Sequence, residues 1–150
     1  MNRPLLLVLF LLANGCAILI GGPGAGGRTP RDLAQARARW ERAGLDDYTF
    51  TLQRNCFCPE EYRGPFEVQV ENDRIVRVTR EGQPADQHVA QVPTIEELFG
   101  LLEGAYAGSA ERVVATYDAA LGYPVEFFID ESTQIADEEI GYHVPALTPR

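Results

Sequence analysis

The two cysteines Cys56 and Cys58, spaced as Cys-Phe-Cys before Pro59, have the most distinctive chemistry in the sequence. Two thiols separated by one residue can form a disulfide, exchange with another thiol, or supply two of the four ligands of a tetrahedral metal ion. On an unbroken strand their Cα atoms would lie near the ~6.8 Å upper limit for a bridge, so a bridge needs a bend at Phe57. We expect an intrachain disulfide between Cys56 and Cys58. Thiol redox chemistry and metal binding by the same pair remain the alternatives.

Acidic side chains gather between Asp130 and Glu139 and raise the question of a metal site. An EF-hand loop starting at Asp130 would place Ile135 at the invariant glycine and Gly141 at the bidentate glutamate, which excludes that motif. A solvated turn is the simpler interpretation, and we expect neither a metal nor another cofactor. The residues that could form an irregular calcium site instead are Asp130, Asp137, Glu138 and Glu139.

Motifs that position common catalytic groups are absent from the sequence. It contains no Gly-X-Ser-X-Gly, no phosphate-binding loop and no His-Glu-X-X-His. His88 falls in a polar connection, and His143 alternates with Tyr142 and Val144 on the outward face of a predicted strand. We expect both histidines to be solvated or locally hydrogen-bonded, and we assign no catalytic residue.

The loop from Asp118 to Pro124 is the candidate for ligand binding, because loops carry binding residues more often than the elements they connect. It offers an acid, nearby aromatic rings and a glycine turn. The alternative is that its tyrosines cap the core and its proline blocks edge pairing. The four residues assigned to this candidate binding loop are Asp118, Gly122, Tyr123 and Pro124.

The N-terminus has the layout of an export signal: Arg3, then an apolar run, then small residues before Cys16. The stretch that ends at Cys16 resembles a bacterial lipobox. We therefore expect a signal peptide over residues 1–16, lipidation of Cys16, a glycine-rich tether over 17–29 and a single domain over 30–147. The alternatives are an uncleaved N-terminal helix that anchors the chain and cleavage after the tether glycines to release a secreted protein.

Composition and charge narrow the possible partners. The chain has 150 residues, of which 45% are hydrophobic, and a net charge of -9, which fits one globular domain with short appendages. All basic residues are arginine, and the acidic excess has the wrong sign for a phosphate-binding surface, so we expect no nucleic acid partner. An anionic bilayer would repel the domain as well. Membrane association would therefore depend on the N-terminal lipid or anchor.

The pattern of apolar residues predicts the elements that position these groups. Capping signals and helical spacing predict helices over 30–43 and 95–107. Alternating apolar residues predict strands around Phe50, Val68 and Val78 and over 112–117, 125–129 and 139–144. The predicted fold is α+β, in the order α-βββ-α-βββ, with six mostly antiparallel strands and two helices on one face. The other face is then expected to be polar or to bind a ligand.

The hairpin at Asn72 and Asp73 is constrained by the same alternation. A two-residue loop would set Val68 opposite Arg77, whereas an odd number of loop residues sets Val68 opposite an apolar residue. We therefore expect a three-residue loop.

Several short motifs together resemble a known family. They are Trp40, Tyr-Thr-Phe at 48–50, Cys-Phe-Cys-Pro at 56–59, Tyr-Asp at 117–118, Gly-Tyr-Pro at 122–124 and Asp-Glu-Glu at 137–139. With them the chain resembles a family of uncharacterised bacterial exported proteins, a domain of unknown function whose members are often predicted lipoproteins. The likeness covers about residues 33–145, and its most specific parts are Cys-Phe-Cys-Pro and the later Gly-Tyr-Pro. The resemblance implies export and a shared architecture, and it implies no activity.

The sequence thus predicts an exported, membrane-anchored lipoprotein of the cell envelope, on the outer side of the membrane or in the periplasm. We expect a non-enzymatic binding or accessory module whose partner is another envelope protein or a small ligand. The alternative function is a thiol redox or metal-binding factor that uses Cys56 and Cys58.

Overall fold

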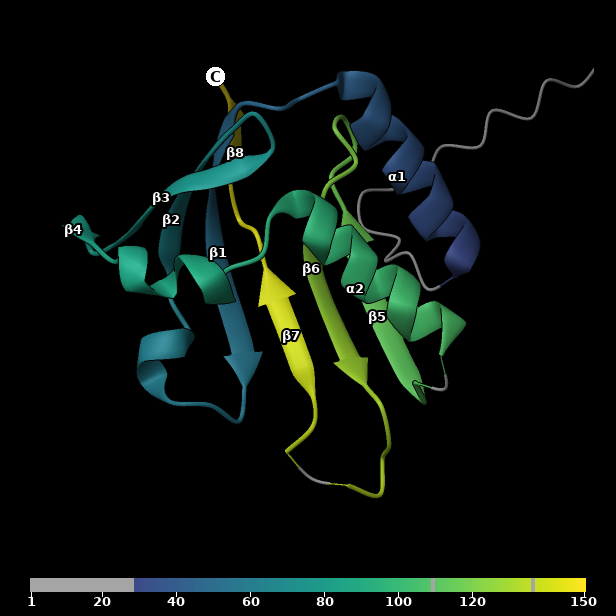
Figure 1. Cartoon of the computed structure of the whole chain (residues 1–150). Helices are drawn as coiled ribbons and strands as arrows, with labels where there is room; N and C mark the ends of the chain where they lie inside the picture. Colours follow the sequence, from purple (N-terminus) through teal and green to yellow (C-terminus); the bar gives the residue numbers. More distant parts are fainter. Residues whose placement is uncertain (1–28, 109, 136) are drawn as a thin grey trace, which may run out of the picture.

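The computed structural model describes residues 29–108, 110–135 and 137–150 (Figure 1). Residues 1–28, with the predicted signal peptide, Cys16 and nearly all of the tether, lie outside the described residues. Within the described residues, no helix has both the length and the apolar character needed to cross a bilayer. The predicted export signal therefore stays a prediction.

The two helices have the predicted bounds because their ends are encoded locally. Helix α1 (Pro30–Ala43) begins after Thr29, whose side chain accepts a hydrogen bond from the Asp32 N–H, and it ends at Gly44 with a left-handed φ of 58°. Helix α2 (Ile95–Ala107) begins with a complete capping box. There the Glu97 N–H donates to the Thr94 hydroxyl, and the Thr94 N–H donates to the Glu97 carboxylate.

In the described parts of the chain, eight strands form one antiparallel sheet, two more than the sequence predicted. Its order is β4-β3-β2-β1-β7-β6-β5, and β8 pairs with the first half of β1, next to β7. The strands are β1 (Tyr48–Cys56), β2 (Phe66–Glu71), β3 (Arg74–Arg80), β4 (Gln83–Pro84), β5 (Arg112–Tyr117), β6 (Pro124–Asp130), β7 (Ile140–His143) and β8 (Leu147–Pro149).

The predicted strand count was wrong because β4 and β8 are too short for an alternating pattern. Strand β4 has two residues and lies in a segment that the sequence predicted as a connection. Strand β8 has three residues and follows Pro145. The described residues also form two short 3-10 helices, η1 (Glu60–Tyr62) and η2 (Asp86–Gln91).

The β2–β3 hairpin also differs from the prediction. Its loop has two residues, Asn72 and Asp73, with left-handed φ values of 50° and 60°, a conformation that these residue types tolerate. The register shifts between Gln69 and Val70, which pair with Arg77 and Ile75, so Val76 of β3 is the extra residue of a bulge. The bulge corrects the parity, so Val68 still pairs with Val78 as expected.

Both helices lie on one face of the sheet, and Figure 1 shows α2 crossing in front of β6 and β5 with α1 beside it. This covered face holds the core, in which β1 buries Tyr48, Phe50 and Leu52. The intervening residues of β1, such as Thr49, Thr51 and Gln53, point to the opposite face. We call this opposite side the open face.

A buried polar cluster ties the sheet to both helices on the covered face. The Trp40 indole N–H donates to Glu96 at 2.6 Å, and the Tyr48 hydroxyl donates to the other Glu96 oxygen at 3.1 Å. The Tyr48 hydroxyl also accepts from the Ile95 N–H at 3.3 Å. Burial, with a further contribution from the Glu96 carboxylate, raises the pKa of Tyr48 above its usual value. The hydroxyl therefore stays protonated and able to donate.

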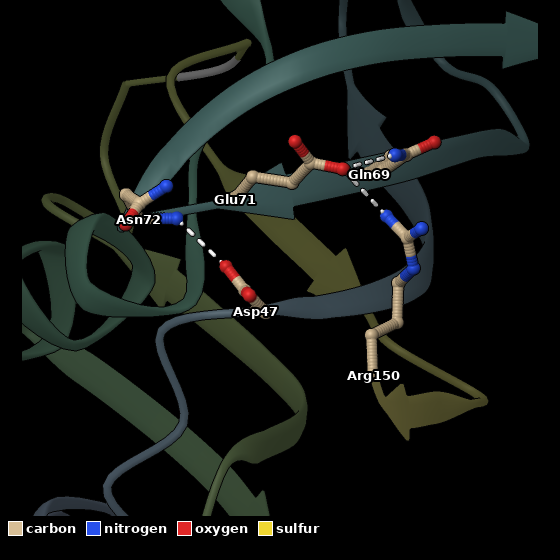
Figure 2. A network of polar contacts seen from close by, with 5 residues as sticks. All are labelled: Asp47, Gln69, Glu71, Asn72 and Arg150. Carbon is tan, nitrogen blue, oxygen red and sulfur yellow. Dashed lines mark hydrogen bonds and ion pairs between the residues drawn. The ribbon is translucent and has the colours of Figure 1, made fainter.

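An exposed polar network holds the start of β1, the β2–β3 turn and the C-terminus together (Figure 2). The Asn72 N–H donates to the Asp47 carboxylate at 2.9 Å. Glu71 accepts from Gln69 at 2.8 Å and from Arg150 at 2.9 Å. The Arg150 N–H donates to the Asp47 carbonyl at 3.0 Å. These contacts are satisfied within the protein and position β8 against β1.

Candidate functional site

A broad hollow of about 760 Å³ lies on the open face, over the half of the sheet formed by β5, β6, β7 and the second half of β1. We call it the hollow. The strand register arranges the central side chains of the hollow in two parallel rows. Each row has one residue from each of the four strands β5, β6, β7 and β1. The first row is Thr116, Glu126, His143 and Gln53, and the second row is Val114, Phe128, Gly141 and Asn55.

The first row is polar and partly pre-arranged. His143 lies between Glu126 and Gln53 in the register, and its Nδ1 is 3.2 Å from the Gln53 amide oxygen. In a neutral ring with that oxygen as acceptor, Nδ1 carries the proton and Nε2 is an acceptor. The Glu126 carboxylate makes no hydrogen bond or ion pair to any other described residue. This row therefore offers several acceptors to a bound molecule.

The second row is mainly apolar and contains a glycine that lowers the floor of the hollow. A Cβ atom on Gly141 would lie 3.3 Å from the Phe127 carbonyl oxygen and 3.4 Å from the Asn55 Cβ. Glycine thus avoids crowding between Phe128 and Asn55, and the residue itself is buried at the floor of the hollow.

Arginines border the hollow on both sides. The Arg112 guanidinium lies over the Phe128 ring, 5.8 Å from its centroid. Arg63 lies beside the end of β1 and donates from Nε to the Cys58 carbonyl at 2.9 Å. Arg54 also borders the hollow, but its guanidinium lies over the Tyr142 ring and donates to the Gln91 carbonyl. Glu126 is the one acid among the described lining residues.

The cysteine pair lies beside the hollow, at the end of β1. The sulfurs of Cys56 and Cys58 are in bonding contact, and their Cα atoms are 5.3 Å apart, as the predicted disulfide requires. Between them, Phe57 is 77% exposed. In the described parts of the chain, no three His, Cys, Asp or Glu side chains converge as metal ligands. Redox and metal chemistry at this pair stay predictions.

The candidate binding loop contacts α1, and fold contacts explain its residue types. The Asp118 carboxylate accepts from two N–H groups of its own turn, at 2.9 and 2.6 Å. Gly122 has a φ of 88°, and a Cβ there would lie 2.3 Å from the Ala36 carbonyl oxygen of α1. Tyr123 and Pro124 are buried. Ligand binding by this loop stays a prediction, and none of its described side chains lines the hollow.

The remaining candidates are His88 and the acids of the predicted calcium site. His88 is buried in η2 beside the Tyr62 and Phe66 rings, and its Nδ1 lies 3.3 Å from the Gln91 amide oxygen. Asp130 ends β6 and is 8% exposed, and Asp137 has a left-handed φ of 76°. The acids Glu138 and Glu139 precede β7 in the chain. A calcium site formed by these acids stays a prediction.

Sequence reasoning identified the open face as a place for binding, but it did not identify the residues of the hollow. Arg112, Phe128, Gly141 and Asn55 belong to no motif. The available signal was the alternation along each strand, which places these residues on the face of the sheet opposite to the buried residues. Combining the four strands into one site required the pairing of β1 with β7, which the sequence alone does not reveal.

Comparison with known proteins identifies a family. The model of a family described as "Family of unknown function (DUF6174)" matches residues 32–149. No curated protein and no solved structure matches the chain. The resemblance inferred from the sequence is therefore confirmed as membership of an uncharacterised family, while the export and lipidation of its members stay predictions.

Proposed function

The chain belongs to this family of unknown function, and we propose that it is a non-enzymatic binding module whose ligand site is the hollow on the open face. We further propose that it acts in the cell envelope, anchored through lipid on Cys16. The single observation that carries the binding function is the uncovered, glycine-floored hollow of about 760 Å³, which falls within the size range of small-molecule sites.

The distribution of hydrogen bonds supports this location. On the covered face, the buried groups of Tyr48, Trp40 and Glu96 satisfy one another. In the hollow, the side chains of Asn55, Glu126 and Arg112 make no hydrogen bond to another residue of the described chain. Exposed groups of this kind can give both their donors and their acceptors to a ligand.

The proposal of export rests on the N-terminal sequence and on cysteine usage. Lipidation of Cys16 would leave Cys56 and Cys58 as an even pair, which suits an oxidising compartment. A tether over 17–29 would have a root-mean-square reach of about 20 Å and would hold the domain clear of the bilayer.

Binding can be tested with a fragment mixture and saturation-transfer NMR on the full chain in a nonionic detergent. Gly141→Val places a branched side chain on the floor of the hollow, and we expect it to abolish most fragment signals. Gly100→Val is the matched control, because a Cβ at Gly100 on α2 meets no atom within 4 Å. Asn55→Trp is a second blocking variant at an exposed position, for the case in which Gly141→Val does not fold. Fragment signals that are unchanged in a folded blocking variant would contradict the proposal.

Anchoring can be tested by palmitate labelling and membrane fractionation. We expect the wild-type chain to incorporate label and to fractionate with membranes, and Cys16→Ala to lose both properties. A Cys16→Ala chain that is still processed and membrane-bound would contradict the lipid anchor.

The redox alternative has a simple test. We expect the thiols of Cys56 and Cys58 to resist alkylation in the non-reduced protein. If both thiols titrate reversibly across a physiological series of glutathione potentials, the redox factor replaces the structural bridge.

A further inference from the structure

We propose that the ligand of the hollow is an organic carboxylate with an apolar body and a hydrogen-bond donor at its far end. This inference rests on the proposed function of the hollow. The carboxylate binds Arg112, the apolar body lies along Val114 and Phe128, and the donor reaches Glu126 and His143.

Arg112 is the anchor because its guanidinium is held in place but is not neutralised. It stacks over the Phe128 ring at 5.8 Å, and that contact limits its freedom and shields one of its faces from water. Asp130 is directly opposite in the register, yet the pair forms no ion pair within 4.0 Å. An arginine of this kind can form a bidentate pair with a planar carboxylate at low entropic cost.

The charge of the hollow contrasts with that of the protein. The chain has 22 acids and 13 arginines, and its net charge is -9. The charged residues that line the hollow are Arg54, Arg63, Arg112 and Glu126. Arg54 and Arg63 donate to the neutral carbonyls of Gln91 and Cys58, so neither is neutralised, and the arginines outnumber the one acid of the lining. A negatively charged ligand reduces this positive excess.

The order of residues along the strands sets the shape of the ligand. Arg112, Val114 and Thr116 alternate along β5, opposite Asp130, Phe128 and Glu126 of β6. Arg112 and Thr116, the partner of Glu126, are thus four residues apart on β5. The Arg112 end and the Glu126 end of the hollow are therefore about 13 Å apart along the strand. Val114 and Phe128 occupy the middle, so the intervening part of the ligand is apolar. Glu126 and the Nε2 of His143 can only accept at the far end, so the ligand donates there.

The surrounding geometry favours a small ligand over a peptide strand. A peptide that adds to a sheet pairs with the main chain of an edge strand. β6, β7 and β1 are interior strands whose main-chain groups already pair on both sides, and β5 is the edge strand. A peptide strand would therefore pair beyond β5, beside the hollow, whereas the hollow itself offers side chains, which suit a compact molecule.

The test measures dissociation constants by NMR titration of the full chain in nonionic detergent at low salt. The probes are 4-phenylbutyrate, its neutral amide 4-phenylbutyramide, and phenyl phosphate. We expect the carboxylate to bind about tenfold or more tightly than the amide, and we expect added salt to reduce the difference. Arg112→Gln should remove that difference. Arg77→Gln should preserve it, because Arg77 is exposed on the same face but outside the hollow.

A second pair of probes tests the far end. We expect 4-(4-aminophenyl)butyrate to bind more tightly than 4-phenylbutyrate in the wild type, and we expect Glu126→Leu, whose side chain has no acceptor, to lose most of that gain. If the amino group gives no gain in the wild type, the assignment of the donor is wrong.

Each remaining outcome is decisive and separates the inference from the proposed function. If the amide binds in the hollow as tightly as the carboxylate, or if Arg112→Gln has no effect, the carboxylate inference is wrong and the binding function stands. If phenyl phosphate binds more than tenfold tighter than the carboxylate, the ligand is a phosphate. If no probe and no fragment shifts the resonances of the hollow, both proposals are wrong.

Discussion

The two faces of the same strands use their polar residues in opposite ways. On the covered face, Tyr48 completes a closed set of hydrogen bonds with Glu96 and Ile95. On the open face, one residue along β1 from the buried core, Gln53 begins a row in which Glu126 has no partner among the described residues. The comparison indicates that the Tyr48 cluster on the covered face contributes to stability, whereas the polar groups of the hollow remain available to a ligand.

The largest expected effect comes from a pair of neighbouring residues on β1. Leu52 is 1% exposed, so Leu52→Ala should lower the free energy of unfolding by about 2–5 kcal/mol. Gln53→Ala on the open face should change it by less than about 0.5 kcal/mol. Urea unfolding followed by the fluorescence of Trp40, the single tryptophan, measures both. Equal losses would show that the open face also stabilises the fold.

The buried hydroxyl of Tyr48 gives a smaller effect. Tyr48→Phe should cost about 1–3 kcal/mol, because it leaves the Ile95 N–H and one Glu96 oxygen without their partner. Tyr62→Phe is the matched control, since the Tyr62 hydroxyl bonds to no other described residue. A neutral Tyr48→Phe variant in the same unfolding assay would contradict the closed network.

The cysteine pair lies at the C-terminal end of β1. A ring closed across one intervening residue restricts the unfolded chain little, so Cys56→Ser/Cys58→Ser should lower stability by about 1.5 kcal/mol or less. The double variant should remain folded, with a cooperative thermal transition by circular dichroism. An unfolded double variant would show that the bridge is essential to the fold.

The smallest effect concerns a like-charge cluster at the β2–β3 turn. Burial, together with Glu96, Asp46 and Asp47, raises the pKa of the Asp73 carboxyl. Its ionised form therefore destabilises the folded state as pH rises through this raised pKa. Asp73→Asn keeps a residue that tolerates the left-handed φ and should add less than about 0.5 kcal/mol at pH 7.

The sign of this effect can be checked by repeating the unfolding at lower pH. The gain from Asp73→Asn should disappear once the pH falls below the ordinary aspartate pKa, where Asp73 is protonated in both states. A gain that persists at that pH would point to the turn conformation as its cause.

The sequence predicted features that are encoded locally. The capping residues Thr29, Gly44 and Thr94 define the helix ends, and the structure has both helices with the predicted bounds. Short elements such as β4 and β8 have too few residues for a periodic signal, and the bulge in β2–β3 depends on cross-strand packing. The hollow could not be predicted because it depends on β1 lying next to β7, some 90 residues later in the chain.

The most direct test of the account is an NMR map of the amides that shift when 4-phenylbutyrate is added to the full chain. The account predicts shifts around Arg112–Thr116, Glu126–Phe128, Gly141–His143 and Gln53–Asn55, all on the strands of the hollow. The competing location is the groove of about 470 Å³ between α1 and α2, lined by Leu33, Arg37 and Tyr106. Shifts confined to that groove, with the strands of the hollow unchanged, would contradict the claim that the open face is the binding face.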